Sequence, residues 1–205
     1  MGWYRDRLFP RLLDSACATA PKQAVRAAVC APLAGDVLEI GFGTGLNLVH
    51  LPVAVRRLLV VDPMSTTRRR TAERIAASPV PVEVVGLDGR QLALADASVD
   101  AVLMTWTLCS IADPGAAVGE IARVLRPGGR LHFVEHGRAP DDRVRHWQDR
   151  LNGIQRRIAC GCNLNRDIPA ILDANGLRVD GLATFYVDGD PKLLGWTFQG
   201  TAAPS

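Results

Sequence analysis

The sequence predicts an α/β fold. It is expected to be a Rossmann-like doubly wound sheet of about seven strands, parallel except for one antiparallel strand in a C-terminal hairpin. Short apolar runs recur along the chain after Gly35, and helix-like or turn segments fill the intervals between them. This alternation is typical of a parallel sheet with helices on both faces. The runs are almost continuously apolar, as expected for strands buried on both sides.

Five apolar runs are the predicted strands of the parallel part, at residues 37–40, 58–61, 82–85, 99–104 and 130–136. Residues 177–198 contain two more strand-like runs, separated by a turn-rich segment at 187–192. Turn residues between two such runs predict a hairpin that closes the sheet.

Helical segments are expected before and between these strands. Asp113 and Pro114 open one of them, because Asp can cap a helix and proline is tolerated in the first turn. A Pro-Gly-Gly sequence at 127–129 ends that helix and turns the chain into the fifth strand. The other predicted helical segments are residues 22–30, 46–51, 64–77, 141–158 and 167–175, the last ending at Gly176.

Length and composition exclude several classes of protein. The chain has 205 residues, of which 48% are hydrophobic and 22% charged, which predicts one folded domain. No run approaches the ~20 apolar residues needed to span a bilayer, and charges interrupt the N-terminal stretch. A net charge of +3 and an aromatic content of 5% argue against a nucleic-acid partner. Five cysteines, an odd number, favour reduced thiols, so we expect a cytoplasmic protein.

The most informative stretch is a glycine-rich turn directly after the first predicted strand. Gly41, Gly43 and Gly45 allow the backbone to turn sharply and to approach a ligand without a Cβ in the way. Backbone amides at the start of the following helical segment favour the negative end of such a ligand. A purely structural tight turn is the alternative interpretation.

Acidic residues stand at the carboxyl ends of three successive predicted strands, the edge along which open α/β sheets bind ligands. Glu39 lies inside its strand, where a carboxylate is costly to bury unless it holds a partner such as an ammonium group. Asp62 follows Gly41 by 21 residues and can accept hydrogen bonds from both ribose hydroxyls. Asp88 can accept from an exocyclic adenine amine. Each acid alone also fits a helix cap or a turn.

The combination favours a nucleoside with a zwitterionic amino-acid tail over a dinucleotide. The dinucleotide fingerprint has a third glycine where this chain has Leu46, and no phosphate-cradling Gly-Lys-Ser/Thr sequence is present. A dinucleotide-dependent oxidoreductase is therefore the disfavoured alternative.

At these residues the chain resembles the class I S-adenosylmethionine-dependent methyltransferases. The matching segments are LEIGFGTG (38–45), VVDP (60–63), LDG (87–89), SVDAVLM (98–104) and EIARVLRPGGRLHFVEH (120–136). Within that class it resembles the thiol methyltransferase-like group with a type 11 domain, which includes membrane-associated mammalian enzymes. The segments that carry this narrower similarity are TLCS (107–110), EH (135–136), WQ (147–148) and GCNLNR (161–166).

The resemblance implies S-adenosylmethionine as cofactor and S-adenosylhomocysteine as product. It implies glycines under the methionyl tail, a carboxylate facing the ammonium, another on the ribose, and an Asp-Gly pair at the adenine. The cofactor-binding residues implied are Glu39, Gly41, Gly43, Gly45, Asp62, Pro63, Asp88, Gly89 and Thr105. Phe42 departs from the small or aliphatic residue usual in the loop, and the apolar anchor of the mammalian relatives has no counterpart here. We therefore expect no stable membrane anchor.

The same resemblance suggests where catalysis takes place. Methyl transfer requires an aligned acceptor and exclusion of water, and a thiol acceptor gains from a nearby base. We expect His136 to act as that base, with Glu135 orienting it. The alternative is that His136 only bonds a neighbouring loop. Cys109 is expected to be a buried structural residue, and Cys160 with Cys162 makes a poor zinc site, so no metal is predicted.

We therefore expect one methyltransferase domain, residues 1–205, in three parts. They are an N-terminal helical cap (1–34), a cofactor-binding core (35–136), and an acceptor-pocket segment with the closing hairpin (137–205). The expected reaction is methyl transfer to a small-molecule acceptor, a thiol by resemblance, carried out by a monomer or homodimer. Small-molecule O- or N-methylation and a non-catalytic nucleoside-binding module are the alternatives.

Overall fold

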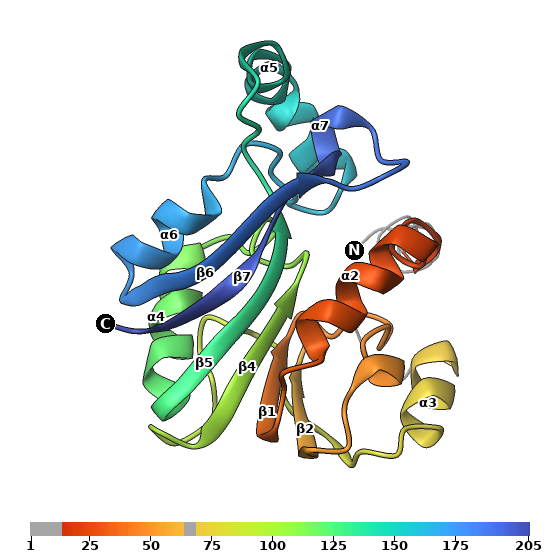
Figure 1. Ribbon diagram of the computed structural model, residues 1–205, viewed down its shortest axis with the longest axis vertical. Helices are drawn as coiled ribbons and strands as arrows, with labels where there is room; N and C mark the ends of the chain where they lie inside the picture. Colours follow the sequence, from red (N-terminus) through yellow and green to blue (C-terminus); the bar gives the residue numbers. More distant parts are fainter. Residues whose placement is uncertain (1–13, 64–68) are drawn as a thin grey trace.

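Seven strands form one sheet in the order β3-β2-β1-β4-β5-β7-β6 in the computed structural model, which describes residues 14–63 and 69–205 (Figure 1). The strands β3, β2, β1, β4 and β5 pair in parallel, and β7 is antiparallel to both of its neighbours, β5 and β6. This confirms the predicted sheet. The bounds are β1 Gly35–Ile40, β2 Val55–Val61, β3 Val82–Gly86, β4 Val99–Thr105, β5 Leu125–His136, β6 Leu177–Tyr186 and β7 Trp196–Pro204.

Helices cover both faces of the sheet. In Figure 1, α4 and α6 lie on one side, α2 and α3 lie on the other, and α5 stands beyond the carboxyl end of β5. The helices include α2 Ala20–Cys30, α3 Arg69–Ala76, α4 Pro114–Val124, α5 Asp142–Ile158, α6 Ile168–Ala174 and α7 Lys192–Gly195, with a 3₁₀ turn, η2, at Leu48–His50. None of the helices in the described part of the chain is long and apolar enough to cross a membrane.

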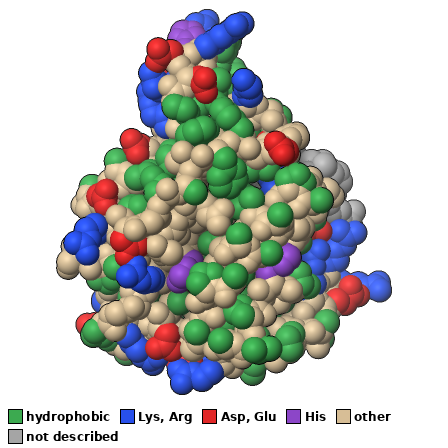
Figure 2. Space-filling model, in the orientation of Figure 1, with side chains coloured by type: hydrophobic (Ala, Val, Ile, Leu, Met, Phe, Trp, Pro, Cys, Tyr) green, Lys and Arg blue, Asp and Glu red, His purple; other side chains and the backbone are tan. Residues whose placement is uncertain are grey.

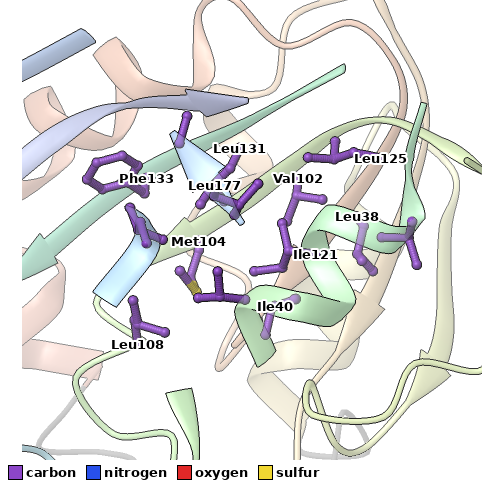
Figure 3. Close-up of a cluster of buried hydrophobic side chains, with 14 of the residues drawn as sticks. Leu38, Ile40, Val102, Met104, Leu108, Ile121, Leu125, Leu131, Phe133 and Leu177 are labelled. Atoms are coloured by element: carbon purple, nitrogen blue, oxygen red, sulfur yellow. The ribbon is translucent and has the colours of Figure 1, made fainter. Parts of the chain in front are cut away.

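Two apolar cores form because successive side chains of a strand point to opposite faces of the sheet. The core under α4 and α6, part of which is drawn in Figure 3, contains buried side chains of β1, β4, β5 and α4 such as Leu38, Met104, Phe133 and Ile121. The core under α2 contains the strand residues of the other parity, including Val37, Leu58, Leu103 and Val134, together with Val29 and Cys30 of α2. The near-continuous apolar runs of the sequence thus reflect burial on both sides.

Element boundaries differ from the sequence-based expectation in a few places. The helical segment expected at 46–51 is only the short turn η2, and of the helix expected at 64–77 the structure describes Arg69–Ala76. Strand β5 begins at Leu125, which pairs with Val99, and the pairing then skips the Pro-Gly-Gly turn to resume at Arg130. The closing hairpin is confirmed, with the small helix α7 inside its connection.

The order of the strands positions a site. The connections on the two sides of β1 and β4 run outward in opposite directions, so the strand order reverses between these two neighbours. In open α/β sheets the ligand binds in the crevice at such a point, outside the carboxyl ends of the strands. Gly41, Gly43 and Gly45 follow the end of β1, and Asp62 and Asp88 follow the ends of β2 and β3, whereas Glu39 lies within β1 and Glu135 within β5.

Removing a buried strand side chain should cost far more stability than removing an exposed one. Leu131 on β5 is fully buried, whereas Leu182 on β6 is 47% exposed. We expect Leu131→Ala to lower the free energy of unfolding by about 2–5 kcal/mol, because it leaves a cavity in the core. The matched control Leu182→Ala should cost about 0.5 kcal/mol. Urea unfolding followed by circular dichroism checks this, and equal losses in the two variants would contradict the burial assigned to β5.

Candidate active site

A cavity of about 810 Å³ opens at the carboxyl edge of the sheet, at the point where the strand order reverses. Its walls come from the loops after β1, β2, β3 and β4, from the end of β5, and from α2 and the segment 155–162. Pockets for small organic ligands fall in this range of volume. Of the predicted site residues, Gly41, Gly43, Asp62, Pro63, Asp88, Gly89, Thr105 and His136 line the cavity. Glu39, Gly45 and Glu135 lie outside its lining.

The glycine loop is held close to two neighbouring loops. Gly41 has φ +82°, and a Cβ built on it would lie 2.0 Å from Oγ1 of Thr107, so only glycine fits there. The amide of Gly43 donates to Oδ2 of Asp62 over 2.6 Å. A Cβ on Gly43 would meet no atom closer than 4.0 Å, which leaves this side of the loop open to the cavity. The loop therefore presents bare backbone to a ligand.

Asp88 and Gly89 line the cavity after β3, as the sequence predicts, but the Asp88 carboxylate already has a partner. It forms an ion pair of 2.7 Å with Arg90, whose backbone amide also donates to it. These hydrogen bonds lower the pKa of Asp88 to about 2. Gly89 lies close against the side chain of Ile40. A Cβ added to Gly89 would be 2.7 Å from that side chain, so a larger residue does not fit there. This part of the cavity is an apolar slot with an acid at its rim.

A buried polar network lies beneath the glycine loop, and sequence reasoning found only part of it. Oε1 of Glu39 accepts from Asn47 over 2.8 Å, and Asn47 also donates to Oγ1 of Thr105. Arg26 of α2 donates to the side chains of Asn47 and Thr105, and its guanidinium lies 4.8 Å from the centre of the Trp106 ring. Arg26 and Asn47 carry no local sequence signal, because a lone arginine in an amphipathic helix is indistinguishable from a surface residue.

Glu39 sits behind the cavity wall rather than in it. Its Oε2 has no hydrogen-bond partner among the described residues. Burial raises the pKa of Glu39 to about 8, although Asn47 and the charge of Arg26 act in the opposite direction. As the sequence predicts, burying this carboxylate has an energetic cost, and Asn47 is the side chain that donates a hydrogen bond to it.

Residues of α2 and α3 hold the glycine loop and the segment before α7 in place. Arg74 of α3 donates to the carbonyl and hydroxyl oxygens of Thr44 and to the carboxylate of Asp14. Lys22 of α2 forms a 2.8 Å ion pair with Asp190, which precedes α7. The predicted N-terminal cap thus touches both the glycine loop and the C-terminal segment. Trp3 and Tyr4 lie outside the described residues.

The other end of the cavity contains two thiols and an imidazole. Nε2 of His136 lies 3.0 Å from Sγ of Cys162, and this sulfur lies 3.8 Å from Sγ of Cys109. All three side chains line the cavity. The sequence predicts a structural role for Cys109 and groups Cys162 with Cys160, whereas the fold pairs Cys162 with Cys109. A contact across 53 residues has no signal in the spacing of the cysteines.

The three groups perturb one another. The hydrogen bond from Cys109 and the contact with His136 lower the pKa of Cys162, although burial opposes this. The hydrogen bond to Cys162 and burial raise the pKa of Cys109. Burial is the largest effect on His136 and by itself would lower its pKa, but the hydrogen bond and charge of Cys162, together with the charges of Glu135 and Asp190, make the net direction upward.

Glu135 does not orient His136, contrary to the expectation from the sequence. Its two carboxylate oxygens accept the backbone amides of Thr107, Leu108 and Cys109, over 2.7, 2.8 and 3.3 Å. Burial raises the pKa of Glu135 to about 7, while these amides pull it back down. Nδ1 of His136 has no partner among the described residues. Adjacent strand residues point to opposite faces of the sheet. Glu135 therefore bonds to the turn after β4, while His136 contacts Cys162.

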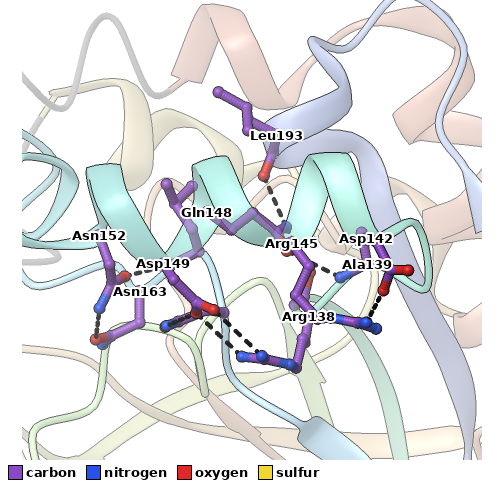
Figure 4. Close-up of polar contacts among 12 residues, drawn as sticks. Arg138, Ala139, Asp142, Arg145, Gln148, Asp149, Asn152, Asn163 and Leu193 are labelled. Carbon is purple, nitrogen blue, oxygen red and sulfur yellow. Dashed lines mark hydrogen bonds and ion pairs between the residues drawn. The ribbon is translucent and has the colours of Figure 1, made fainter.

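Polar contacts tie helix α5 to the segments on either side of it (Figure 4). Buried Gln148 accepts from the amide of Ala139 and donates to the carbonyl oxygens of Gly137 and Leu193. Asn152 accepts from the amide of Leu164 over 2.8 Å, which ties the segment 161–166 to the helix.

The segment 161–166 is in turn tied to the turn after β4. The backbone amide and Nδ2 of Asn163 both donate to the carbonyl oxygen of Cys109. Arg166 donates to the carbonyl oxygen of Leu108. Trp147 is 45% exposed on α5 and does not line the cavity, whereas Trp106, directly after β4, does.

The match to a known family covers the glycine loop and most of the parallel part of the sheet. Residues 38–133 match the family model described as a methyltransferase domain. This segment is a methyltransferase domain. The chain is 36% identical over 143 residues to the human thiol S-methyltransferase TMT1B and 34% identical over 136 residues to human TMT1A. Both alignments cover 64% of this chain and 55% of the relative, so the chain spans about half the length of these curated relatives.

Solved structures agree on the fold of the methyltransferase domain and its surroundings. A protein solved in complex with the Trm112 methyltransferase activator of Haloferax volcanii has a TM-score of 0.71 over 96% of this chain and 97% of its own, at 16% identity. A SAM-dependent methyltransferase from Thermotoga maritima has a TM-score of 0.67 over 96% of this chain and 98% of its own, at 19% identity.

The cofactor of such a domain is S-adenosylmethionine, and the residues present fit it. The backbone at Gly43 is open to the cavity, and Asp62, which would face a ribose, is tied to that backbone. Oε2 of Glu39 has no hydrogen-bond partner among the described residues, so a methionyl ammonium nearby would give this buried carboxyl the partner it lacks. Ile40 and Gly89 form an apolar slot suited to a flat base.

The close approach at Gly41 yields a test of the cofactor site. Because a Cβ at this position would clash with Thr107 and φ is positive, we expect Gly41→Ala to weaken S-adenosylmethionine binding at least roughly tenfold. Gly119→Ala on α4 is the control, since a Cβ there meets nothing within 4 Å. Titration calorimetry measures both, and an unchanged affinity in Gly41→Ala would contradict the assignment of the loop.

The buried acid yields a pH-dependent test. Because the folded-state pKa of Glu39 is raised from 4.5 to about 8, the folded chain keeps a proton that the unfolded chain releases in this interval. The contribution of Glu39 to stability therefore falls as the pH rises through it. We expect Glu39→Gln to gain stability relative to the parent chain by on the order of 2 kcal/mol between about pH 5 and about pH 8, measured by urea unfolding without cofactor.

Glu120→Gln is the matched control for that test. Hydrogen bonds from Arg123 lower the pKa of Glu120 to about 2, so this group stays ionised throughout the interval. Its substitution should change stability by the same amount at both pH values. A pH-independent effect of Glu39→Gln would show that Glu39 is ionised in the folded chain.

Proposed function

We propose that this protein transfers the methyl group of S-adenosylmethionine to the sulfur of a small-molecule thiol. One observation carries the proposal: a single cavity joins the glycine loop of the methyltransferase domain to a buried group of two thiols and an imidazole. The names of the curated relatives, thiol S-methyltransferases, support the same acceptor class.

The chain's own residues account for cofactor binding. Gly41 and Gly43 present backbone to the methionyl part, and Asp62 would accept from the ribose hydroxyls. Arg26 and Lys22 line the cavity from α2, where they would attract the methionyl carboxylate. When bound, the cofactor supplies an electrophilic methyl group on a sulfonium, so the protein needs to align an acceptor and exclude water rather than activate the donor.

The acceptor end of the cavity suits a small, partly apolar molecule. Ile111, Ala112, Ala159 and Leu194 line the cavity together with the thiol and imidazole group. A thiol has an unperturbed pKa of about 8.5 and must lose its proton to attack. We assign His136 as the catalytic residue that promotes this ionisation, because it is the imidazole of the cavity. Glu135 is a positioning residue, since it holds the turn that carries Cys109.

The proposal also takes the acceptor as a diffusible small molecule, not a nucleic acid, and the cytoplasm as the location. Every cysteine in the described residues is a free thiol, as expected in a reducing compartment. On the face seen in Figure 2, Lys and Arg side chains are interspersed with Asp and Glu and form no continuous basic stripe among the described residues.

A methyl-transfer screen tests the proposal. The purified protein is incubated with S-adenosylmethionine and alkyl thiols, aryl thiols, phenols or amines, and methylated products are measured by mass spectrometry. We expect turnover of thiols. We expect His136→Ala to lower kcat/KM by about a hundredfold or more between about pH 6 and pH 9. His146→Ala, on α5 and outside the cavity lining, is the control and should keep most of the rate.

The alternatives give different results in the same screen. Turnover of phenols or amines but not of thiols would replace S-methylation by O- or N-methylation. Cofactor binding without transfer to any acceptor would point to a nucleoside-binding module. A parental rate in His136→Ala would remove His136 from the mechanism and leave the acceptor class standing.

A further inference from the structure

The thiol and imidazole group at the acceptor end of the cavity has the composition of a metal site. The candidate ligand atoms of Cys109, His136 and Cys162 all lie within 4.8 Å of one another. Within the residues that the structure describes, this is the one such group of three or more His, Cys, Asp or Glu side chains. Its members come from the turn after β4, the end of β5 and the segment after α5, so the fold assembles it.

The distances suit zinc. With zinc–sulfur bonds of about 2.3 Å and tetrahedral angles, two ligand sulfurs lie roughly 3.8 Å apart. The sulfurs of Cys109 and Cys162 are 3.8 Å apart. Nε2 of His136 lies 3.0 Å from the Cys162 sulfur and would move away by about half an ångström to reach a tetrahedral position.

We propose that Cys109, His136 and Cys162 bind a Zn²⁺ ion through their two Sγ atoms and Nε2, with a fourth position open to the cavity. A site with three protein ligands and one open position is the catalytic type of zinc site, whereas structural sites have four protein ligands. The open position would take the acceptor thiolate. This last step rests on the proposed function, while the zinc site itself does not.

The charges and hydrogen bonds around the cluster support a dication there. Two thiolates 3.8 Å apart would be costly without a cation, and the Glu135 carboxyl group that accepts from the amide of Cys109 adds a third acidic group. A zinc ion together with the guanidinium of Arg166 would bring the net charge of the two thiolates and the Glu135 carboxylate close to zero. Nε2 of Gln155 donates to the Cys162 sulfur over 3.8 Å, and Oγ of Ser110 lies 3.4 Å from the Cys109 sulfur. Such bonds to ligand atoms orient them and stabilise their charge.

The zinc ion would let an acceptor thiol react at neutral pH, and His136 would promote ionisation of the thiol as a ligand of the metal instead of as a free base. On binding, the thiol gives its proton to solvent and becomes a thiolate ligand. The thiolate attacks the methyl carbon, a sulfur–carbon bond forms, and the bond from that carbon to the sulfonium breaks with its electron pair going to the sulfur of S-adenosylhomocysteine. The product is a neutral thioether, which binds zinc weakly and leaves. Oxidation states do not change.

The expectation of no metal considered only Cys160 and Cys162 as a ligand pair. That pair offers two thiols at a spacing that lacks further ligands nearby in the sequence. Cys160 does line the cavity but does not belong to the cluster. It is therefore a matched control for the cysteines that do.

The experiment measures metal binding directly. The untagged full chain, purified with a non-thiol reductant, is titrated with Zn²⁺ and separately with Co²⁺, followed by elemental analysis and visible spectra. We expect about one zinc ion per chain, and in the cobalt form thiolate-to-cobalt charge transfer with the intense visible bands of tetrahedral coordination. Cys109→Ser and Cys162→Ser should each weaken zinc binding by roughly a hundredfold or more. Cys160→Ser should bind like the parent chain.

S-adenosylmethionine affinity measured in every variant shows that it remains folded. A parent chain that binds no zinc overturns the inference, and so does equal binding by the parent and Cys162→Ser. Thiol turnover by a zinc-free, chelator-treated chain at the parental rate would also overturn it while leaving the proposed function intact. Zinc bound as expected, with no transfer to any thiol, would leave the site standing and refute the proposed function.

Discussion

The close approach of the glycine loop to the turn after β4 is the contact on which the rest of the site depends. Gly41 leaves no room for a side chain against Thr107, and Thr107 is fixed because its amide donates to the buried carboxylate of Glu135. The same carboxylate holds the amides of the next two residues, which brings Cys109 to the cavity. One chain of contacts thus sets the cofactor loop and the acceptor end at a constant separation.

The acceptor end is completed from the C-terminal part of the chain. Gln148 of α5 bonds to backbone groups on both sides of it, which joins the exit from β5 to the connection before β7. Asn163 then links the segment after α5 to Cys109. Because hydrogen bonds to backbone carbonyls and amides define direction as well as distance, Cys162 meets Cys109 in one orientation. The hairpin that closes the sheet therefore also supports the site.

The site is maintained at a cost to stability. Glu39 and Glu135 are fully buried carboxyl groups whose pKa values are raised by burial, and Arg26 is buried beneath the glycine loop. Trp106 has φ +51°, a conformation that side chains rarely adopt, at the point where β4 enters the cavity. Burial and strain of this kind persist where the surrounding structure over-determines them and commonly mark functional sites. The two apolar cores on either side of the sheet supply the stability that makes this arrangement possible.

The sequence by itself determined the fold class, the five parallel strands, the closing hairpin, the glycine loop and the positions of Asp62, Asp88 and His136 at the carboxyl edge. These follow from local patterns, since strand and helix periodicity and turn residues are encoded within a few neighbouring positions. Only the tertiary structure decided that Glu135 holds a turn instead of orienting His136. It also decided that Arg26 and Asn47 lie under the loop and that Cys162 meets Cys109 rather than acting with Cys160. These are contacts between segments far apart in the chain, and no short-range pattern records them, because they depend on how the elements pack.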